Sequence, residues 1–318
     1  MTEVRRIVCL GECMLELSRN PGGGDGWRMG FGGDTLNTAV HLARSGHRVS
    51  YMTALGSCPF SENLRRAWES EGIDCSLVVT HPTRRPGIYA ISTNDEGERS
   101  FTYWRDSSAA RAMFEISEIE EAIAKAETAD LFYFSLISMA ILPPQGRRDL
   151  ILLAKAVREK GGLVAFDSNY RPVLWESRYA AQYWRDQAIA LANIGLPTFD
   201  DEAELCSARD EGEVAAHWRG LGCEEVIVKL GARGCLLPDG NSCPVPKTVS
   251  PVDTSGAGDA FNAGYLAARI GGGSVLTSAL AGHALAGWCV MHPGAIPQFH
   301  QSAPYGRNEP NPPVAVPQ

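Results

Sequence analysis

The chain has 318 residues, 44% of them hydrophobic and 21% charged, which is enough for one large or two modest globular domains with a sizeable core. The formal net charge of -8 argues against nucleic acid as a partner, because phosphate binding needs clustered positive charge. No apolar stretch approaches the roughly 20 residues of a membrane span. We therefore expect a soluble, cytoplasmic protein in which a few placed arginines meet any anionic substrate.

Short apolar or β-branched runs recur along the chain, at 5–11, 48–56, 130–135, 162–167, 193–197 and 225–231. The first run continues into "ECMLEL", where Glu12 and Glu16 interrupt it, so it is typical of a strand rather than of a signal peptide. Amphipathic segments such as 35–46 and 61–72 lie between the runs and keep helical spacing. This alternation predicts an α/β fold with a mostly parallel sheet covered by helices.

Two regions depart from the alternation. Residues 87–105 indicate two strands, 88–93 and 99–104, joined by the turn "NDEG". We expect them to form an accessory layer over the carboxyl edge of the sheet, where ligands of open α/β folds bind. The proline-rich segment 299–318 lacks periodicity and is expected to be loosely ordered, which leaves 1–298 as the folded domain.

The cysteines and histidines show no metal-binding spacing. Nine cysteines are scattered without a C-x-x-C pair, and the seven histidines form no H-E-x-x-H pattern. We expect mostly buried thiols in a reducing compartment and no structural metal site.

The stretch "DTSGAGDAF" (253–261) carries the strongest chemical signal. Glycine amides that precede a helix form an anion cradle, here at Gly256, Ala257 and Gly258. In phosphoryl transfer, Asp259 can accept the proton of an attacking hydroxyl while these amides stabilise the transferred group. The alternative is an aspartate that only stabilises the helix dipole.

Other phosphate motifs are missing from the sequence. There is no G-x-x-x-x-G-K-[ST] loop, and a dinucleotide fingerprint starting at Gly256 fails at Phe261. A second glycine segment, "KLGARG", follows a predicted strand. Its Lys229, Gly231 and Gly234 either hold nucleotide phosphates from the other side or merely shape a hairpin.

A third glycine segment, "GFGGDTLNTAV" (30–40), precedes a predicted helix. Gly33 can allow a small ligand against the backbone while Asp34 and Asn37 bind its hydroxyl groups. The alternative is a helix capped near Asp34 with no ligand.

In this order, "GGDTLNTAVHLARSG", "KLGARG" and "DTSGAGDAFNAG" resemble the ribokinase-like (PfkB) carbohydrate kinases, and the resemblance runs from about Ile7 to about Pro297. Further segments are similar to the 2-keto-3-deoxygluconate kinases of that family, among them "GECMLELS", "RPGIYAI", "GERSFTYWR" and "FDSNYRPVLW". The resemblance implies a ribokinase-like α/β fold with a small inserted β lid, formed by strands near 12–31 and 87–105. It also implies ATP as donor, Mg²⁺ and a monovalent cation such as K⁺.

The resemblance assigns roles to individual residues. Asp259 is the base that takes the proton of the substrate's C6 hydroxyl, with the anion hole at Gly256, Ala257 and Gly258. The nucleotide site comprises Asn169, Lys229, Gly231 and Gly234. The sugar pocket comprises Gly33, Asp34, Asn37, Tyr89, Tyr103, Arg105, Arg171 and Asp253, with Asn169 beside Arg171 and Asp253 also near the monovalent-cation loop.

The arginine residues assigned to the sugar pocket agree with a sugar acid as the substrate. The planar forks of Arg105 and Arg171 suit a carboxylate better than a neutral hexose. Taken without the family motifs, Tyr103 and Trp104 are more typical of lid packing or a dimer contact than of ligand binding. The alternative for Arg171, which precedes a proline, is a surface residue at the end of a strand.

The sequence departs from the family at one motif. The N-x-x-E motif that orders Mg²⁺ through water in many relatives is replaced by "PTFDDEAE", in which Asp201 or Glu202 can take that role. A kinase for another sugar acid, a ketose or a nucleoside stays open, as does a non-catalytic sensor of sugar acid or nucleotide. An exposed lid edge favours a homo-oligomer.

Overall fold

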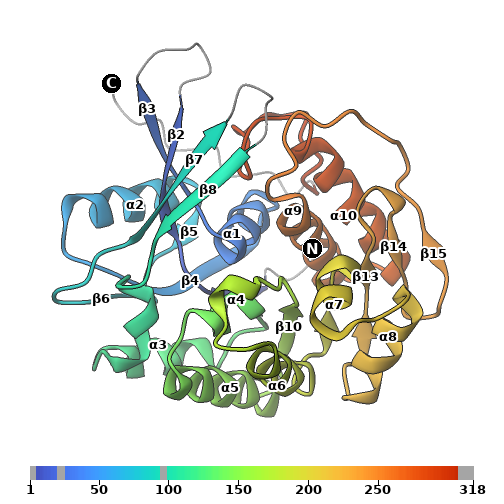
Figure 1. The fold of residues 1–318 in the computed structure, drawn as a ribbon, viewed down its shortest axis with the longest axis horizontal. Coiled ribbons are helices and arrows are strands. Elements are labelled where there is room, and N and C mark those ends of the chain that lie inside the picture. Colours follow the sequence, from blue (N-terminus) through green and yellow to red (C-terminus); the bar gives the residue numbers. More distant parts are fainter. Residues whose placement is uncertain (1–4, 20–25, 94–98, 307–318) are drawn as a thin grey trace.

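A parallel sheet with helices on both faces forms the body of the protein in the computed structural model, which describes residues 5–19, 26–93 and 99–306 (Figure 1). Its strand order is β12 (Glu225–Val226), β11 (Ile194–Gly195), β10 (Leu163–Asp167), β9 (Leu131–Ser135), β1 (Arg6–Leu10), β4 (Arg48–Leu55) and β5 (Ile73–Asp74), and β6 (Val78–Thr80) also pairs with β4. All these pairs are parallel, as predicted. Strands β4 and β5 lie on one side of β1, and the later strands β9 to β12 lie on the other, so the strand order reverses at β1. Ligands of open α/β sheets bind next to such a reversal, at the carboxyl ends of the strands.

Alternating side chains of the central strands enter two separate cores. In β1, Ile7 and Cys9 belong to one core, and Val8 and Leu10 belong to the other, as the two-residue period of a strand requires. The Ile7 side is covered by α1 (Asp34–Arg44), α2 (Pro59–Ser70), α9 (Ala257–Ile270) and α10 (Val275–Cys289). The Val8 side is covered by α3 (Ile119–Ala126), α4 (Leu136–Ala140), α5 (Pro144–Glu159), α6 (Arg178–Ile189), α7 (Phe199–Cys206) and α8 (Glu211–Gly220). Three short 3₁₀ helices complete the described chain, η1 (Ala110–Glu115), η2 (Pro172–Leu174) and η3 (Gly231–Arg233).

A separate four-stranded sheet, here called the lid, rises from the body of the protein at the top of Figure 1. Its order is β3 (Trp27–Gly32), β2 (Met14–Arg19), β7 (Gly87–Thr93) and β8 (Arg99–Trp104). The two strands predicted between 87 and 105 are confirmed, and the predicted turn "NDEG" lies outside the described residues. Strand β2 pairs parallel with β7, so the lid is mixed.

A second small sheet contains the "KLGARG" segment. Strands β13 (Val228–Lys229), β14 (Cys235–Leu236) and β15 (Ser242–Cys243) are antiparallel, and η3 forms the turn between β13 and β14. The hairpin expected from the glycines is therefore present.

The segment expected to be loosely ordered from 299 is packed as far as 306. The Tyr305 hydroxyl lies 2.9 Å from His41 Nδ1 and accepts a hydrogen bond from Arg44 at 3.3 Å, and its ring stacks on Phe299. These contacts attach the segment to α1. The Tyr305 ring and its hydroxyl group therefore hold a segment that has no regular apolar periodicity. Residues 307–318 lie outside the described part of the chain.

The expectation of mostly buried thiols is confirmed. All nine cysteines are free, and six are buried: Cys9, Cys13, Cys223, Cys235, Cys243 and Cys289. No described helix is long and apolar enough to cross a membrane.

Candidate active site

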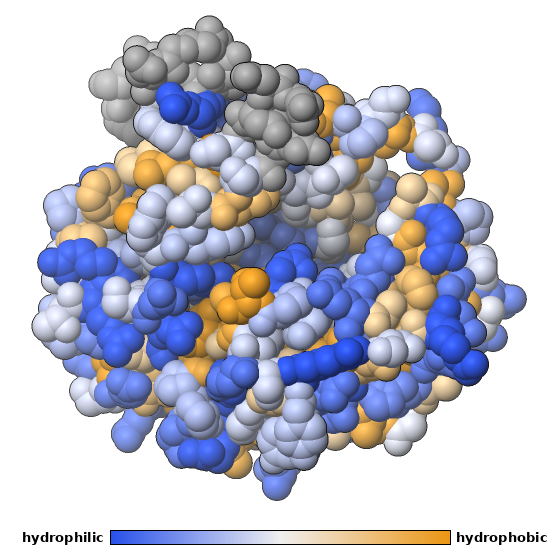
Figure 2. All heavy atoms as spheres, in the orientation of Figure 1, coloured by the Kyte–Doolittle hydropathy of each residue, from blue (hydrophilic) through white to orange (hydrophobic). Residues whose placement is uncertain are grey.

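A cleft of about 1390 Å³ separates the lid from the amino-terminal ends of α1 and α9, and extends between α10 and the β13–β14 hairpin. Figure 2 shows the surface hollowed beneath the lid. Every residue assigned to the site from sequence lines this cleft except Glu202. Segments far apart in the sequence thus meet at the carboxyl ends of the central strands.

The glycine turn before α9 has the shape expected of an anion cradle. Gly256 is the N-cap with φ 70°, in the left-handed region, and a Cβ there would lie 2.5 Å from that of Ala295. The first turn of α9 leaves amides without intrahelical partners that face the cleft end of the helix. One amide differs from the expectation, because Ala257 N–H donates to the carbonyl of Thr254 at 3.3 Å.

Asp259 lies in that first turn and is only 8% exposed. Its Oδ2 accepts a hydrogen bond from Asn37 Nδ2 at 2.8 Å, and its backbone carbonyl accepts one from Thr38 at 3.2 Å. Burial, followed by the nearby charge of Asp34, raises the pKa of Asp259 to about 8. A buried carboxylate with a pKa near neutrality is suited to taking a proton from a hydroxyl group.

Asp34 faces the cleft and does not cap α1. The N-cap is Gly33, without a side-chain cap bond, so the capping alternative is wrong. The Asp34 carboxylate accepts hydrogen bonds from the Ser135 hydroxyl and, at 3.2 Å, from Asn169 Nδ2. A Cβ at Gly33 would lie 2.2 Å from the carbonyl oxygen of Glu12. The close approach of these two backbone segments therefore requires glycine here, whether or not a ligand binds.

Lys229 brings the hairpin to the glycine turn. Its Nζ lies 3.0 Å from Asp167 Oδ1, and a Cβ at Gly258 would lie 3.7 Å from the same Nζ. Asn262 Nδ2 donates to the other Asp167 oxygen at 2.8 Å. Sequence reasoning missed Asp167 and Asn262, although Asp167 ends a predicted strand at the carboxyl edge and Asn262 lies three residues after Asp259.

The lid contributes aromatic rings to the cleft. Tyr89 and Tyr103 are cross-strand partners whose ring centroids lie 6.0 Å apart, and the Tyr89 hydroxyl donates to Glu16. Arg105 Cζ lies 5.8 Å from the Tyr103 ring centroid, so the guanidinium contacts the aromatic ring.

The two arginines expected to hold a carboxylate differ in environment. Arg105 is 7% exposed, and its guanidinium already donates to the buried Glu12 carboxylate, with Nε at 2.8 Å. Arg171 has a side chain that is 50% exposed, and donates to the Tyr170 carbonyl at 2.7 Å and to Asp201 at 3.4 Å. Glu12 therefore neutralises one of the two charges. Its only sequence signal was the interruption of an apolar run.

Asp253 holds two loops together at the edge of the cleft. Its Oδ1 accepts from the amide of Ser255 at 3.0 Å, and its Oδ2 accepts from that of Gly294 at 2.7 Å. The remaining hairpin residues, Gly231 and Gly234, have positive φ and line the cleft together with residues of α10.

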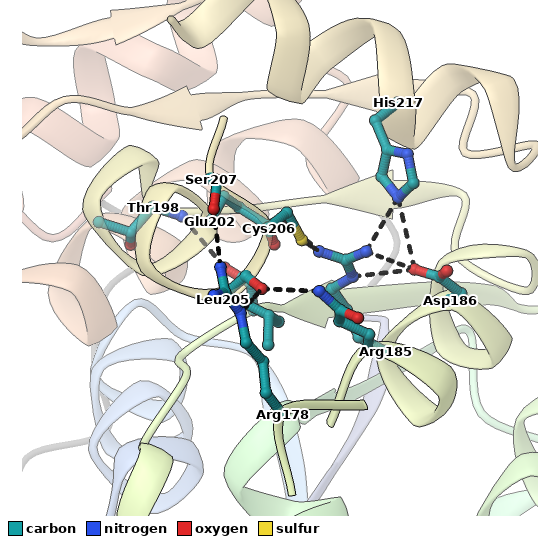
Figure 3. Close-up of polar contacts among 11 residues, drawn as sticks. Arg178, Arg185, Asp186, Thr198, Glu202, Leu205, Cys206, Ser207 and His217 are labelled. Atoms are coloured by element: carbon teal, nitrogen blue, oxygen red, sulfur yellow. Dashed lines mark hydrogen bonds and ion pairs between the residues drawn. The ribbon is translucent and has the colours of Figure 1, made fainter. Parts of the chain in front are cut away.

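The structure separates the two acids considered for Mg²⁺. Asp201 lines the cleft, and burial raises the pKa of its carboxyl to about 6. Glu202 points into the core and pairs with Arg185 NH1 at 2.7 Å (Figure 3). Arg185 also contacts Asp186, at 2.6 Å, and His217. Glu202 is therefore a structural ion-pair partner away from the cleft.

The sequence matches the pfkB family of carbohydrate kinases over residues 4–301. The chain belongs to this family. It is 40% identical to 2-dehydro-3-deoxygluconokinase of Escherichia coli strain K12 over 303 residues, which cover 92% of the chain and 97% of the relative. It is 39% identical to 2-dehydro-3-deoxygluconokinase of Dickeya dadantii, covering 92% of the chain and 96% of that relative.

Solved structures have the same fold. Aminoimidazole riboside kinase from Salmonella enterica, complexed with aminoimidazole riboside and an ATP analog, superposes with a TM-score of 0.77 at 25% identity, covering 94% of this chain and 96% of that one. A fructokinase double mutant from Vibrio cholerae O395, bound to fructose, ADP and a potassium ion, has a TM-score of 0.80 at 22% identity and 96% coverage of both chains. The ribokinase-like fold with its lid is thus confirmed for this PfkB sugar kinase.

The raised pKa of Asp259 makes the stability of this PfkB kinase depend on pH. An unfolded aspartate has a pKa near 4, so between about pH 4 and 8 the folded protein keeps a proton that the unfolded chain has lost. The contribution of Asp259 to stability falls as pH rises through this window, by about 1.4 kcal/mol per pH unit. We expect Asp259→Asn to stabilise the ligand-free protein more at pH 8 than at pH 5 in urea unfolding. A difference that does not change with pH contradicts this, and Asp106→Asn, at an exposed cleft position, is the control.

The separation of Asp201 from Glu202 predicts different effects on folding. Glu202→Ala leaves the buried Arg185 without its buried partner and should lower the free energy of unfolding by about 3 kcal/mol. Asp201→Asn should not lower it at pH 7, because burial already disfavours that charge. Urea unfolding of both variants, with exposed Asp200→Asn as the matched control, measures the contrast. Equal losses at 201 and 202 would contradict the assignment.

Proposed function

We propose that this kinase transfers the γ-phosphoryl group of ATP to the C6 hydroxyl of 2-keto-3-deoxygluconate, also called 2-dehydro-3-deoxygluconate, giving ADP and 2-keto-3-deoxy-6-phosphogluconate. Relatives 40% identical over nearly their whole length bear the corresponding kinase name. One observation supports the chemistry above all. A buried carboxylate, Asp259, lies in the first turn of α9 in the same cleft as Lys229 and a glycine turn.

In the proposed mechanism, Asp259 accepts the proton of the C6 hydroxyl as its oxygen attacks the γ-phosphorus. Asn37, which donates to Asp259 Oδ2, holds the carboxylate in place. The amides of the α9 first turn and the Lys229 ammonium stabilise the negative charge that the transferred group carries. The lid covers the sugar end and excludes water, which limits idle hydrolysis of ATP.

The cleft offers a donor set that fits Mg²⁺. Asp201 provides a carboxylate next to Arg171 and near Asp167, and magnesium prefers such oxygen ligands together with water and phosphate. We propose that Asp201 holds the ion through water, and when bound the ion neutralises charge on the β- and γ-phosphates. For K⁺, we propose the loops that Asp253 joins, near residues 253–256 and 294.

The substrate carboxylate is assigned chiefly to Arg171. Its guanidinium is half exposed in the cleft and keeps donors for a ligand, whereas Arg105 is committed to Glu12. In this proposal Arg105 positions the Tyr103 ring. Its own attraction for the substrate carboxylate is weaker than that of Arg171, because Glu12 neutralises much of its charge.

Two carboxylates beside the lid favour a second candidate, a kinase for a neutral ketose. Glu12 and Glu16 both line the sugar end, and carboxylates there can accept hydrogen bonds from sugar hydroxyl groups as readily as they can orient Arg105 and Tyr89. A non-catalytic sensor is the third outcome, although Asp259 would then serve no purpose.

We propose homo-oligomer formation through the lid. Large hydrophobic side chains that do not line the cleft are exposed on its strands, namely Trp27, Met29 and Trp104. Unpaired edges and exposed rings of this kind commonly pair with a copy of the same surface.

Coupled ADP release tests the proposed function. With Mg-ATP we expect selective turnover of 2-keto-3-deoxygluconate over fructose, ribose and adenosine, and the galactonate epimer is included to measure the epimer preference. Asp259→Asn should lower kcat at least 100-fold with little change in KM, because it removes the proton acceptor and keeps its shape. Turnover of fructose instead supports the neutral-ketose candidate, and no turnover of any compound supports the sensor.

Arg171→Ala tests the carboxylate contact. Loss of a charge-assisted hydrogen bond should raise the KM for 2-keto-3-deoxygluconate about 10- to 100-fold and leave that for ATP nearly unchanged. Steady-state kinetics with each substrate varied in turn measures this, with Arg148→Ala on the outer surface of α5 as the control. An increase confined to the KM for ATP removes Arg171 from the sugar pocket.

A further inference from the structure

Two cysteines and a histidine converge behind the nucleotide end of the cleft. Cys235 on β14 and Cys243 on β15 are directly opposite each other in the antiparallel register. His283 reaches them from α10, and its Nε2 lies 3.6 Å from Cys235 Sγ. The two sulfur atoms and a ring nitrogen all lie within 4.8 Å of one another, and all three residues are buried.

This spacing matches the coordination shell of zinc. Ligands at 2.3 Å for sulfur and 2.1 Å for nitrogen, placed at tetrahedral angles, lie about 3.6 Å apart. The ring of His283 is also held in place, since Phe261 packs against it with centroids 5.1 Å apart. Its Nε2 lies 3.1 Å from the Cys243 carbonyl oxygen, and an ion bound at Nε2 would replace this contact. The three groups therefore need little movement to enclose an ion.

We propose that Cys235, Cys243 and His283 form a binding site for Zn²⁺, with a fourth position open to water from the cleft. His283 lines the cleft, which gives the ion a path of entry. This reverses the expectation of no metal site that the spacing of cysteines and histidines suggested. The ligands are 8 and 40 residues apart, and only the strand register and the packing of α10 bring them together.

The protonation of the three groups sets how binding depends on pH. Burial raises the pKa of the Cys235 thiol to about 12 and that of Cys243 above its ordinary value, while burial lowers the pKa of His283. The imidazole is thus neutral and ready to bind, and its Nε2 proton shifts to Nδ1. Binding releases two thiol protons to solvent, so the apparent affinity for Zn²⁺ should rise about 10- to 100-fold per pH unit.

An ion at this place would join three walls of the nucleotide end. Gly234, directly before Cys235, packs so closely against β15 that a Cβ would lie 2.1 Å from the Cys243 carbonyl oxygen. Zinc would therefore tie the β13–β14 turn to β15 and to α10. This consequence for nucleotide binding rests on the proposed function, whereas the metal site itself does not.

Metal binding can be measured without any activity. The reduced, chelator-treated full-length protein is titrated with Co²⁺ under inert gas. We expect one Co²⁺ per chain, with intense visible bands of tetrahedral cobalt and near-ultraviolet sulfur-to-cobalt charge transfer, both abolished by one equivalent of Zn²⁺. Substrate turnover plays no part in this readout, so failure of the proposed function leaves it unaffected.

Substitutions of the proposed ligands test whether the ion binds at this site. Cys243→Ser should weaken Zn²⁺ binding at least 10-fold and remove part of the charge-transfer intensity, and His283→Gln should do the same to the affinity if the serine variant fails to fold. Cys223→Ser removes a buried thiol elsewhere and is the matched control. An unchanged spectrum in both site variants overturns the proposal. So does a folded parent protein that shows no cobalt bands, or one in which the two cysteines only form a disulfide, seen as a mass loss of about 2 Da.

Discussion

A buried carboxylate at the start of α9 is the constraint on which the site depends. A helix amino terminus stabilises an anion, typically by less than 2 kcal/mol. At Asp259, however, burial and the nearby Asp34 outweigh that effect and the amide of Asn37, because the pKa rises to about 8. The fold therefore keeps a group whose charge it disfavours, and the two cores on either side of the sheet provide the stability that offsets this cost.

The cleft carries both signs of charge on the side of the lid. Glu12, Glu16 and Asp34 line it there together with Arg19, Arg28, Arg105 and Arg171. The pairing of Arg105 with Glu12 leaves Arg171 as the more accessible of the two guanidinium groups proposed to meet a carboxylate. Under the proposed function, discrimination between a sugar acid and a neutral ketose depends on this balance.

Helix geometry divides the work of α7 between the cleft and the core. Consecutive residues of an α-helix point about 100° apart, so Asp201 and Glu202 cannot face the same way. One carboxylate lines the cleft, and the next anchors Arg185 together with Asp186 and His217 (Figure 3). The buried ion pair holds α6 and α7 together and so determines where Asp201 lies.

The sequence by itself determined the elements of this protein and a set of site residues, all of which except Glu202 line the cleft. Apolar runs and helical spacing depend on near neighbours in the chain, and Gly231, Gly234 and Gly256 mark local turns with positive φ, a conformation that few other residues adopt. Only the tertiary structure decided which charges meet. Glu12 and Arg105 are 93 residues apart, and Cys243 and His283 are 40 apart. Such contacts follow from the order of strands in a sheet and from the packing of helices upon it, which no local pattern specifies, because the side chains that meet belong to segments with independent periodicities.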